Sequence, residues 1–160
     1  MNTKVEILVV DDNSADVKLA MHALRKRTAP EKIAVVRDGE EALTFLFGQG
    51  IDQNTRPASL KLILLDLKLP KVNGFEVLRA IKADDKTKPI PVVVLTSSNQ
   101  ERDLRECYSL GANSYVQKPV DFDHFQELIE RIQQYWLVVN HIPPLSPPDI
   151  HDIRHSEVGL

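Results

Sequence analysis

Polar residues that could do chemistry follow short apolar runs at four separate places in the chain. Asp11 and Asp12 end the first run, ILVV, and Asp66 ends another, LILL. Thr96 follows VVVL, and Lys118 follows the short segment YVQ. Carboxylate oxygens are the ligands that Mg²⁺ prefers, and an aspartate can also act as a nucleophile. Together these side chains predict a divalent-metal site beside a reactive aspartate.

The chemistry that suits such a site is phosphoryl transfer to Asp66. Three crowded carboxylates without a cation would force one of them to take up a proton, and a bound metal removes that penalty. Asp12 and Asp66 could be direct ligands, with Asp11 holding a metal-bound water. Lys118 and the Thr96 hydroxyl would then neutralise and hydrogen-bond the transferred group. The expected product is an aspartyl phosphate.

Each residue also has an ordinary interpretation when it is taken alone. A pair of aspartates after a strand often caps a helix, as can Thr96, and Asp66 could begin a turn. A single lysine such as Lys118 is usually a solvated surface residue. The functional interpretation depends on their agreement in sequence order and in position at strand ends.

Strand-like and helix-like patterns alternate five times along the chain, which positions these residues. The strands are expected at 5–10, 33–36, 60–65, 90–95 and 114–117. Asn13 or Ser14, Asp38 and Asn73 are expected to cap the first three helices, with Glu41 and Glu76 completing capping boxes. Strict alternation predicts an α/β fold with a parallel sheet, right-handed crossovers and helices on both faces. The carboxyl ends of such strands meet at one edge of the sheet.

The helical periodicity also predicts which side chains point into the core. The fourth helix is expected to bury its apolar residues and to stop at Gly111. The last helix, from about Asp121, carries one long apolar stripe. The expected inward residues of these two helices are Leu104, Cys107, Tyr108, Phe125, Leu128, Ile129, Ile132 and Trp136.

Length and composition exclude several classes of protein. A chain of 160 residues with 42% hydrophobic and 27% charged residues suits one globular domain. The net charge of −3, with no basic block, argues against nucleic acid as the main partner. Cys107, the single cysteine, excludes an internal disulfide, and no apolar stretch is long enough to span a membrane. We therefore expect a cytoplasmic protein without a membrane partner.

The two ends of the chain differ in character. Residues 1–137 are expected to form the folded domain, and residues 138–160 a proline-rich tail with no separate output domain. A long polar connection, residues 48–59, precedes the third strand.

Four stretches of the sequence resemble the receiver domain of the two-component response-regulator family, over roughly residues 4–137. They are VVDDN, LLDLKLPKVNG, VVVLTSS and GANSYVQKPVD. The resemblance implies a three-layer, doubly wound, flavodoxin-like fold with a five-stranded parallel sheet in the order 2-1-3-4-5. It also implies that Asp66 accepts a phosphoryl group from a phosphohistidine on a sensor histidine kinase. Mg²⁺ would then be bound by Asp11, Asp12, Asp66 and the backbone carbonyl of Lys68.

The same resemblance assigns further roles. Thr96 and Tyr115 would be the switch pair, although an aromatic residue on the last strand is more often plain packing. Lys118 would contact the phosphate, and the bond between Lys118 and Pro119 would be cis. Lys68 occupies a position that influences how fast phosphate is lost.

A finer resemblance is to the stand-alone regulators that are paired with bacterial phytochromes. It is carried by the phrase IKADDKTKPIPVVVLTSS and the ending YWL. It implies a homodimer through the face of the fourth helix, fifth strand and fifth helix. The alternative is that Trp136 packs on its own domain. The candidate dimer residues are Leu104, Tyr108, Tyr115, Phe125 and Trp136.

Two other functions remain as alternatives. A receiver-like adaptor would work without phosphorylation, but such adaptors tend to lose an acidic residue or the lysine, and both are present. A dehalogenase-type phosphatase needs an acid/base aspartate two residues after its nucleophile, and Lys68 stands there. The protein is therefore expected to be no enzyme beyond assisting its own phosphorylation and dephosphorylation.

Overall fold

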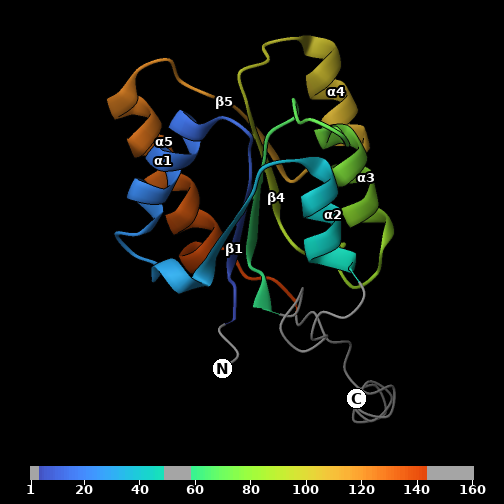
Figure 1. Ribbon diagram of the computed structural model, residues 1–160, viewed down its shortest axis with the longest axis horizontal. Coiled ribbons are helices and arrows are strands. Elements are labelled where there is room, and N and C mark those ends of the chain that lie inside the picture. Colours follow the sequence, from blue (N-terminus) through green and yellow to red (C-terminus); the bar gives the residue numbers. More distant parts are fainter. Residues whose placement is uncertain (1–3, 49–58, 144–160) are drawn as a thin grey trace, which may run out of the picture.

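The protein folds into three layers around a central parallel sheet (Figure 1), as described by a computed structural model over residues 4–48 and 59–143. The strands are β1 (Ile7–Val10), β2 (Ile33–Val36), β3 (Leu62–Leu65), β4 (Val92–Thr96) and β5 (Ser114–Gln117). Their order, β2-β1-β3-β4-β5, confirms the predicted topology. Helices α1 (Ser14–Leu24) and α5 (Phe122–Gln134) cover one face of the sheet, and α2 (Gly39–Phe47), α3 (Gly74–Ala83) and α4 (Glu101–Ser109) cover the other.

The register of the central strands brings their carboxyl ends level with one another. Val10 pairs with Leu65, and Leu65 pairs with Val94. Because β1, β3 and β4 are buried on both faces, their aliphatic side chains fix this register. Asp11 and Asp66, the next residues along β1 and β3, therefore leave the sheet side by side.

Side-chain caps fix where the first three helices begin. Asn13, rather than Ser14, caps α1 by accepting a hydrogen bond from the backbone N–H of Asp16. Asp38 caps α2, and the Glu41 carboxylate accepts from the backbone N–H of Arg37 in return. Asn73 caps α3. The three predicted helix starts are thus confirmed, whereas β1, β3 and β4 each begin two residues later than expected.

The predicted packing of α4 is only partly correct. Cys107 is fully buried, but Leu104 is 36% and Tyr108 50% exposed, so the expectation that these two are buried was wrong. The helix is nine residues long, and Cys107 is its one buried residue. Gly111 ends it as predicted, with a φ of 102° that favours glycine.

A half-buried lysine joins three segments at the amino-terminal edge of β4 and β5. The Lys82 ammonium on α3 donates to the carbonyl oxygens of Lys88 at 3.0 Å and Ile90 at 2.8 Å, and to Asn113 Oδ1 at 2.9 Å. Asn113 Oδ1 also accepts from the backbone N–H of Val92, where β4 begins. These bonds fix the ends of β4 and β5 that lie farthest from the carboxylates.

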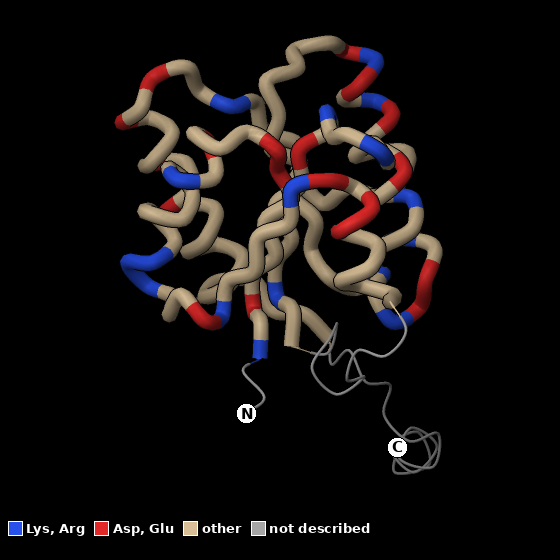
Figure 2. The backbone as a smooth tube through the Cα atoms, in the orientation of Figure 1, with Lys and Arg blue, Asp and Glu red and all other residues tan. Residues whose placement is uncertain are grey.

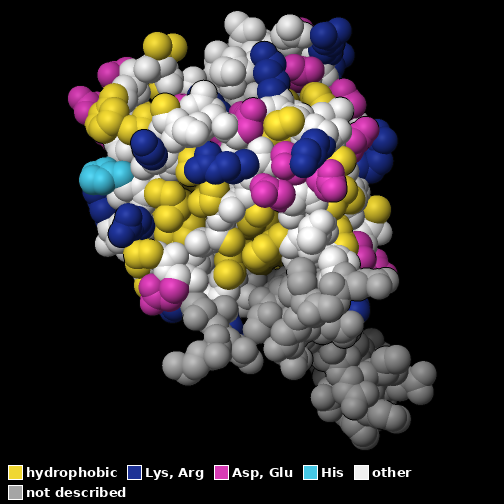
Figure 3. All heavy atoms as spheres, viewed as in Figure 1, with side chains coloured by type: hydrophobic (Ala, Val, Ile, Leu, Met, Phe, Trp, Pro, Cys, Tyr) yellow, Lys and Arg dark blue, Asp and Glu magenta, His cyan; other side chains and the backbone are white. Residues whose placement is uncertain are grey.

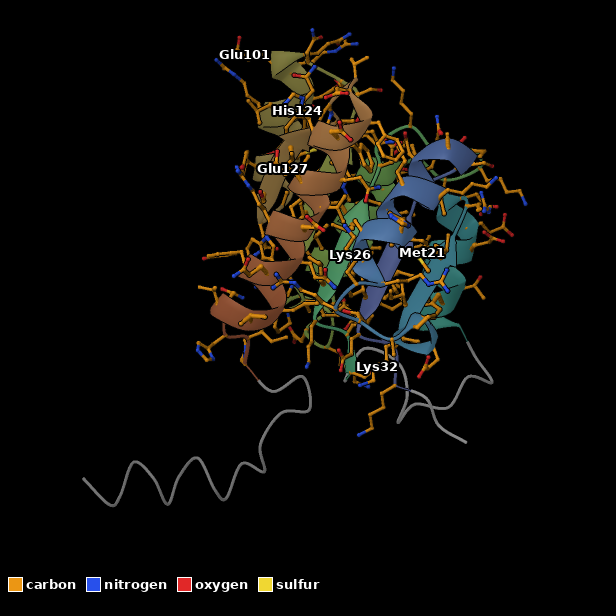
Figure 4. The ribbon with its side chains drawn as sticks, turned by 90° about the vertical axis from the view of Figure 1, so that its left-hand side faces the viewer. Met21, Lys26, Lys32, Glu101, His124 and Glu127 are labelled. Carbon is orange, nitrogen blue, oxygen red and sulfur yellow. The ribbon has the colours of Figure 1, made fainter. Side chains whose placement is uncertain are left out.

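Helices α1 and α5 are held together by polar bonds as well as apolar packing (Figure 4). Lys26, which lies between them in this view, pairs with Glu130 at 2.8 Å. The Gln126 and Gln133 amides donate to the backbone carbonyls of Leu19 and Leu24. The position of α1 is therefore fixed along its length by α5.

The end of α5 extends the folded domain slightly beyond the expected boundary at residue 137. A π-helical turn, Tyr135–Val139, continues the helix. Trp136 is half-buried against the α1 and α5 core, which supports its packing on its own domain. Most of the long connection and of the tail lies outside the described residues.

At the edge strand β2, Ile33 is buried and the other three side chains are only partly covered. Hydrophobic side chains gather on this side of the surface, beneath a band of charged residues (Figure 3). No helix within the described residues is long and apolar enough to cross a membrane.

Candidate functional site

Acidic residues meet at the carboxyl edge of the sheet (Figure 2). Asp11, Asp12 and Asp66 each offer a carboxylate oxygen, and these atoms all lie within 4.8 Å of one another. Asp11 and Asp66 are buried, whereas Asp12 is exposed. The backbone holds them in place, because the N–H of Asp66 donates to the Val10 carbonyl at 2.9 Å. The structure thus brings together the three carboxylates that the sequence predicted.

Lys118 lies at the centre of this cluster and makes three ion pairs. Its ammonium is 2.9 Å from Asp11 Oδ2, 2.9 Å from Asp66 Oδ2 and 2.8 Å from Asp16 Oδ2. Burial favours the neutral amine, but the hydrogen bonds to Asp16 and Asp11 and the charge of Asp66 outweigh it, so the pKa of Lys118 is raised. The lysine is therefore a fixed cation beside Asp66.

Burial raises the pKa of Asp11, although the N–H of Asn13 and the Lys118 ammonium act in the opposite direction. The Asn13 bond, at 2.9 Å, is made to Asp11 Oδ1, while Lys118 takes Oδ2. A cation placed at this carboxylate would offset its desolvation.

Asp16 is a site residue that the sequence analysis missed. It is the third residue of α1, in the turn that begins directly after Asn13. The helix that carries Asp16 starts directly after Asp11 and Asp12, so an acidic residue in its first turn can reach the same edge of the sheet. That position, four residues past Asp12, was the signal that could have identified it.

The structure places Thr96 and Tyr115 around one backbone segment after β4. Thr96 is buried, and its hydroxyl oxygen accepts from the N–H of Ser98 at 3.3 Å. The Tyr115 hydroxyl donates to the Ser98 carbonyl at 3.1 Å. Ser98 also donates through its side chain to Asp103 on α4 at 2.6 Å. The expected switch residues are therefore both bonded to the segment that leads into α4.

Two expectations about the neighbouring backbone have different outcomes. The described residues contain no cis peptide bond, so the prediction of a cis bond between Lys118 and Pro119 was wrong. The trans form is the intrinsically favoured isomer even before proline, and the Lys118 N–H keeps a 2.7 Å bond to the Thr96 carbonyl. The metal-binding role of the Lys68 carbonyl stays a prediction, while the Lys68 N–H lies 3.4 Å from Asp66 Oδ1.

The carboxylates fit a small divalent cation. Oxygen ligands of one Mg²⁺ are roughly 3 Å apart in adjacent positions and roughly 4 Å apart in opposite ones, so side-chain rotations would have to bring these oxygens, which all lie within 4.8 Å of one another, closer together. All are hard oxygen donors, and Lys118 engages only one oxygen of Asp11 and of Asp66. Asp11, Asp12 and Asp66 are therefore the residues that would hold a divalent metal at this edge of the sheet.

Only some of the candidate residues for the dimer face are exposed. Phe125 is 2% exposed and packs in the core between α5 and the sheet, so its assignment to that face was wrong. The helical periodicity had also predicted that Phe125 points into the core, and that prediction is confirmed. Leu104 and Tyr108 are exposed, and Tyr115 is half-buried.

Comparison with known proteins identifies the family to which the chain belongs. The response regulator receiver domain family matches residues 7–132. The chain is 41% identical to the probable methanogenesis regulatory protein FilR2 of Methanothrix harundinacea (strain 6Ac), over 86% of each chain. It is 40% identical to the response regulator Rcp1 of Synechocystis sp. (strain ATCC 27184 / PCC 6803 / Kazusa), over 86% of this chain and 92% of Rcp1.

Solved structures of similar proteins share the fold. The Mn²⁺-bound form of Rcp1 has a TM-score of 0.78 at 39% identity, covering 88% of this chain and 99% of that chain. The phosphorylated cyanobacterial phytochrome response regulator RcpA has a TM-score of 0.78 at 38% identity, with the same coverage. The acidic cluster is of the kind in which receiver domains bind divalent metals.

Proposed function

Because this chain belongs to the response regulator receiver family, we propose that it accepts a phosphoryl group on Asp66 from the phosphohistidine of a sensor histidine kinase. An Asp66 carboxylate oxygen forms the new O–P bond, and the P–N bond to the kinase histidine breaks as the imidazole leaves. The observation that carries the proposal is the convergence of Asp66, Asp11, Asp12 and Lys118 at one edge of the sheet. The signal would then pass on by protein contact.

The residues of the site have distinct roles in this reaction. Asp11, Asp12, Asp66 and the Lys68 carbonyl would hold Mg²⁺, which when bound supplies positive charge to the phosphoryl oxygens. Lys118 supplies positive charge from the protein itself and lies 2.9 Å from Asp66. The Thr96 hydroxyl would donate to a phosphoryl oxygen and give up its present bond with Ser98. Such a change, with Tyr115 bonded to the same segment, would carry the state of Asp66 to α4.

Labelling with a small phosphodonor tests the proposal directly. Protein incubated with acetyl phosphate and Mg²⁺ should gain the mass of one phosphoryl group, and the gain should disappear when EDTA is added. A wild-type protein that is folded but never labelled, with donor or with any kinase, would favour the phosphorylation-independent adaptor instead. A panel of sensor kinases, phytochrome-type ones first because of the likeness to RcpA, would identify the donor.

Replacing Asp12 with alanine is expected to weaken Mg²⁺ binding by roughly tenfold or more, because it removes one of the three clustered carboxylates. Isothermal titration calorimetry gives the affinity. Wild-type protein should also gain about 2.7 kcal/mol in free energy of unfolding at a Mg²⁺ concentration 100 times the dissociation constant. Asp85→Ala, which removes an exposed carboxylate elsewhere, is the control. Equal affinity in both variants would argue against Asp12 as a ligand.

We also propose a homodimer through the face formed by α4, β5 and the end of α5. Tyr108 and Leu104 are exposed apolar residues on α4, and Tyr135, Val138 and Val139 are exposed at the end of α5. Exposed apolar side chains grouped on one face are typical of protein interfaces.

Tyr108→Glu is expected to shift the protein toward monomer, because it places a charge in an apolar contact. The dimer affinity should fall by roughly tenfold or more. Sedimentation velocity across a concentration series measures this. Thr44→Glu adds the same charge to an exposed position on α2 and should leave the dimer intact. Equal effects of the two substitutions would place the interface elsewhere.

A further inference from the structure

Asp16 contacts the reactive cluster but has no role in the reaction described above. Its carboxylate lies 2.8 Å from the Lys118 ammonium and is 24% exposed, whereas the lysine side chain is 8% exposed. Within the described residues, three carboxylates therefore contact this amine directly, those of Asp11, Asp16 and Asp66, and Asp12 lies beside Asp11 and Asp66.

The backbone fixes Asp16 firmly enough to act as an anchor. Asp16 is in the first turn of α1, and its N–H is bound by the Asn13 cap at 3.0 Å. Further along, α1 is fastened to α5 through Gln126 and Gln133. An aspartate also has a short side chain, so its carboxylate moves little relative to the helix.

The hydrogen bonds of Lys118 show why a third carboxylate matters. An ammonium has three protons, and each is directed to one carboxylate, on Asp11, Asp16 or Asp66. In the proposed reaction Asp66 becomes an acyl phosphate, and Asp11 would be one of the residues that hold the metal. Asp16 neither holds the metal nor accepts phosphorus, so its bond to Lys118 is the one that the reaction leaves unchanged.

We infer that Asp16 is a positioning residue, which keeps the Lys118 ammonium at the edge of the sheet while its other two protons pass to the phosphoryl oxygens. This inference rests on the proposed function of Asp66. Charge-assisted hydrogen bonds of this kind are short and directional, and displacing a catalytic group by about 1 Å can slow a reaction by up to roughly 100-fold.

Asp16→Asn tests the inference, since it keeps the shape of the side chain and removes its charge. The labelling rate with acetyl phosphate and saturating Mg²⁺ should fall about tenfold. In metal-free protein the ¹H–¹⁵N signal of the Lys118 side chain should shift and broaden, because the ammonium exchanges a charged acceptor for a neutral amide oxygen that binds it less strongly. Asp16→Glu restores the charge and should recover part of the labelling rate and part of the wild-type Lys118 signal.

Glu76→Gln is the matched control. Glu76 is the third residue of α3 and follows an asparagine cap in the same way, but its carboxylate makes no hydrogen bond or ion pair with the described residues. It therefore corrects for the loss of a favourable charge near a helix N-terminus. Its labelling rate and Lys118 signal should match those of the wild type.

The outcomes separate this inference from the proposed function. Labelling of Asp16→Asn within twofold of the control, with an unchanged Lys118 signal, would overturn the positioning role while leaving Asp66 as the acceptor. Absence of labelling in the wild type would instead overturn the proposed function, and the Lys118 signal would still report whether Asp16 holds the amine. Equal slowing in Asp16→Asn and Glu76→Gln would reduce Asp16 to a helix-stabilising residue.

Discussion

The Asp66→Asn variant is expected to lose phosphoryl labelling by roughly 10³-fold or more, which is typical when a nucleophile is removed. The amide has no anionic oxygen to attack phosphorus, and it also weakens the divalent-metal site because one carboxylate of the cluster is gone. Intact-mass spectrometry after incubation with acetyl phosphate and Mg²⁺ measures the loss. Peptide mapping of the wild type should locate the label on Asp66.

The fold of this variant should be retained, which keeps the result interpretable. Lys118 loses one ion pair but keeps those with Asp11 and Asp16. Removing a buried negative charge from a crowded acidic cluster also relieves repulsion. Asp85→Asn makes the same change at an exposed position and should label like the wild type. Full labelling of the Asp66→Asn variant would show that another residue is the acceptor.

Gly39→Ala is expected to lower the free energy of unfolding by about 3 kcal/mol, because the added methyl group has no space. A Cβ atom at Gly39 would overlap the backbone carbonyl of Val72, and backbone atoms cannot rotate away as a side chain would. The N–H of Gly39 also approaches the Pro70 carbonyl at 3.4 Å. Urea unfolding followed by circular dichroism measures the change.

The matched control is Glu40→Ala, one residue along the same helix at an exposed position. It should change stability by only about 0.5 kcal/mol, as surface substitutions usually do. If Gly39→Ala were as stable as this control, α2 and the loop after β3 would have to move apart without cost. The loop leads directly from Asp66, so a reduced labelling rate should accompany the loss of stability.

Local sequence signals predicted the parts of the fold that depend on local chemistry. The aliphatic runs identified β1, β3 and β4 because these strands are buried on both faces. Asp38 and Asn73 identified the starts of α2 and α3 because a cap acts within three residues. The strand order, in contrast, came from family resemblance, since local patterns do not determine which strands are neighbours.

The features that were predicted wrongly or missed depend on contacts between distant segments. Periodicity marked Leu104 and Tyr108 as apolar, but it cannot show that α4 meets the sheet along so narrow a strip. Asp16 meets Lys118 from a position 102 residues away, so no window of sequence contains the pair. The prediction of a cis bond before Pro119 came from the family resemblance, and the structure has the intrinsically favoured trans isomer there.

The three acceptors gathered by Lys82 have a mechanical consequence for signalling. They fasten β4 and β5 at the amino-terminal edge of the sheet, while Thr96 and Ser98 lie at and beyond the carboxyl end of β4. Because β4 is also paired with β3 and β5 along its length, a rearrangement near Asp66 should leave the strand in place. Displacement should begin in the segment after Thr96 and be largest where α4 starts.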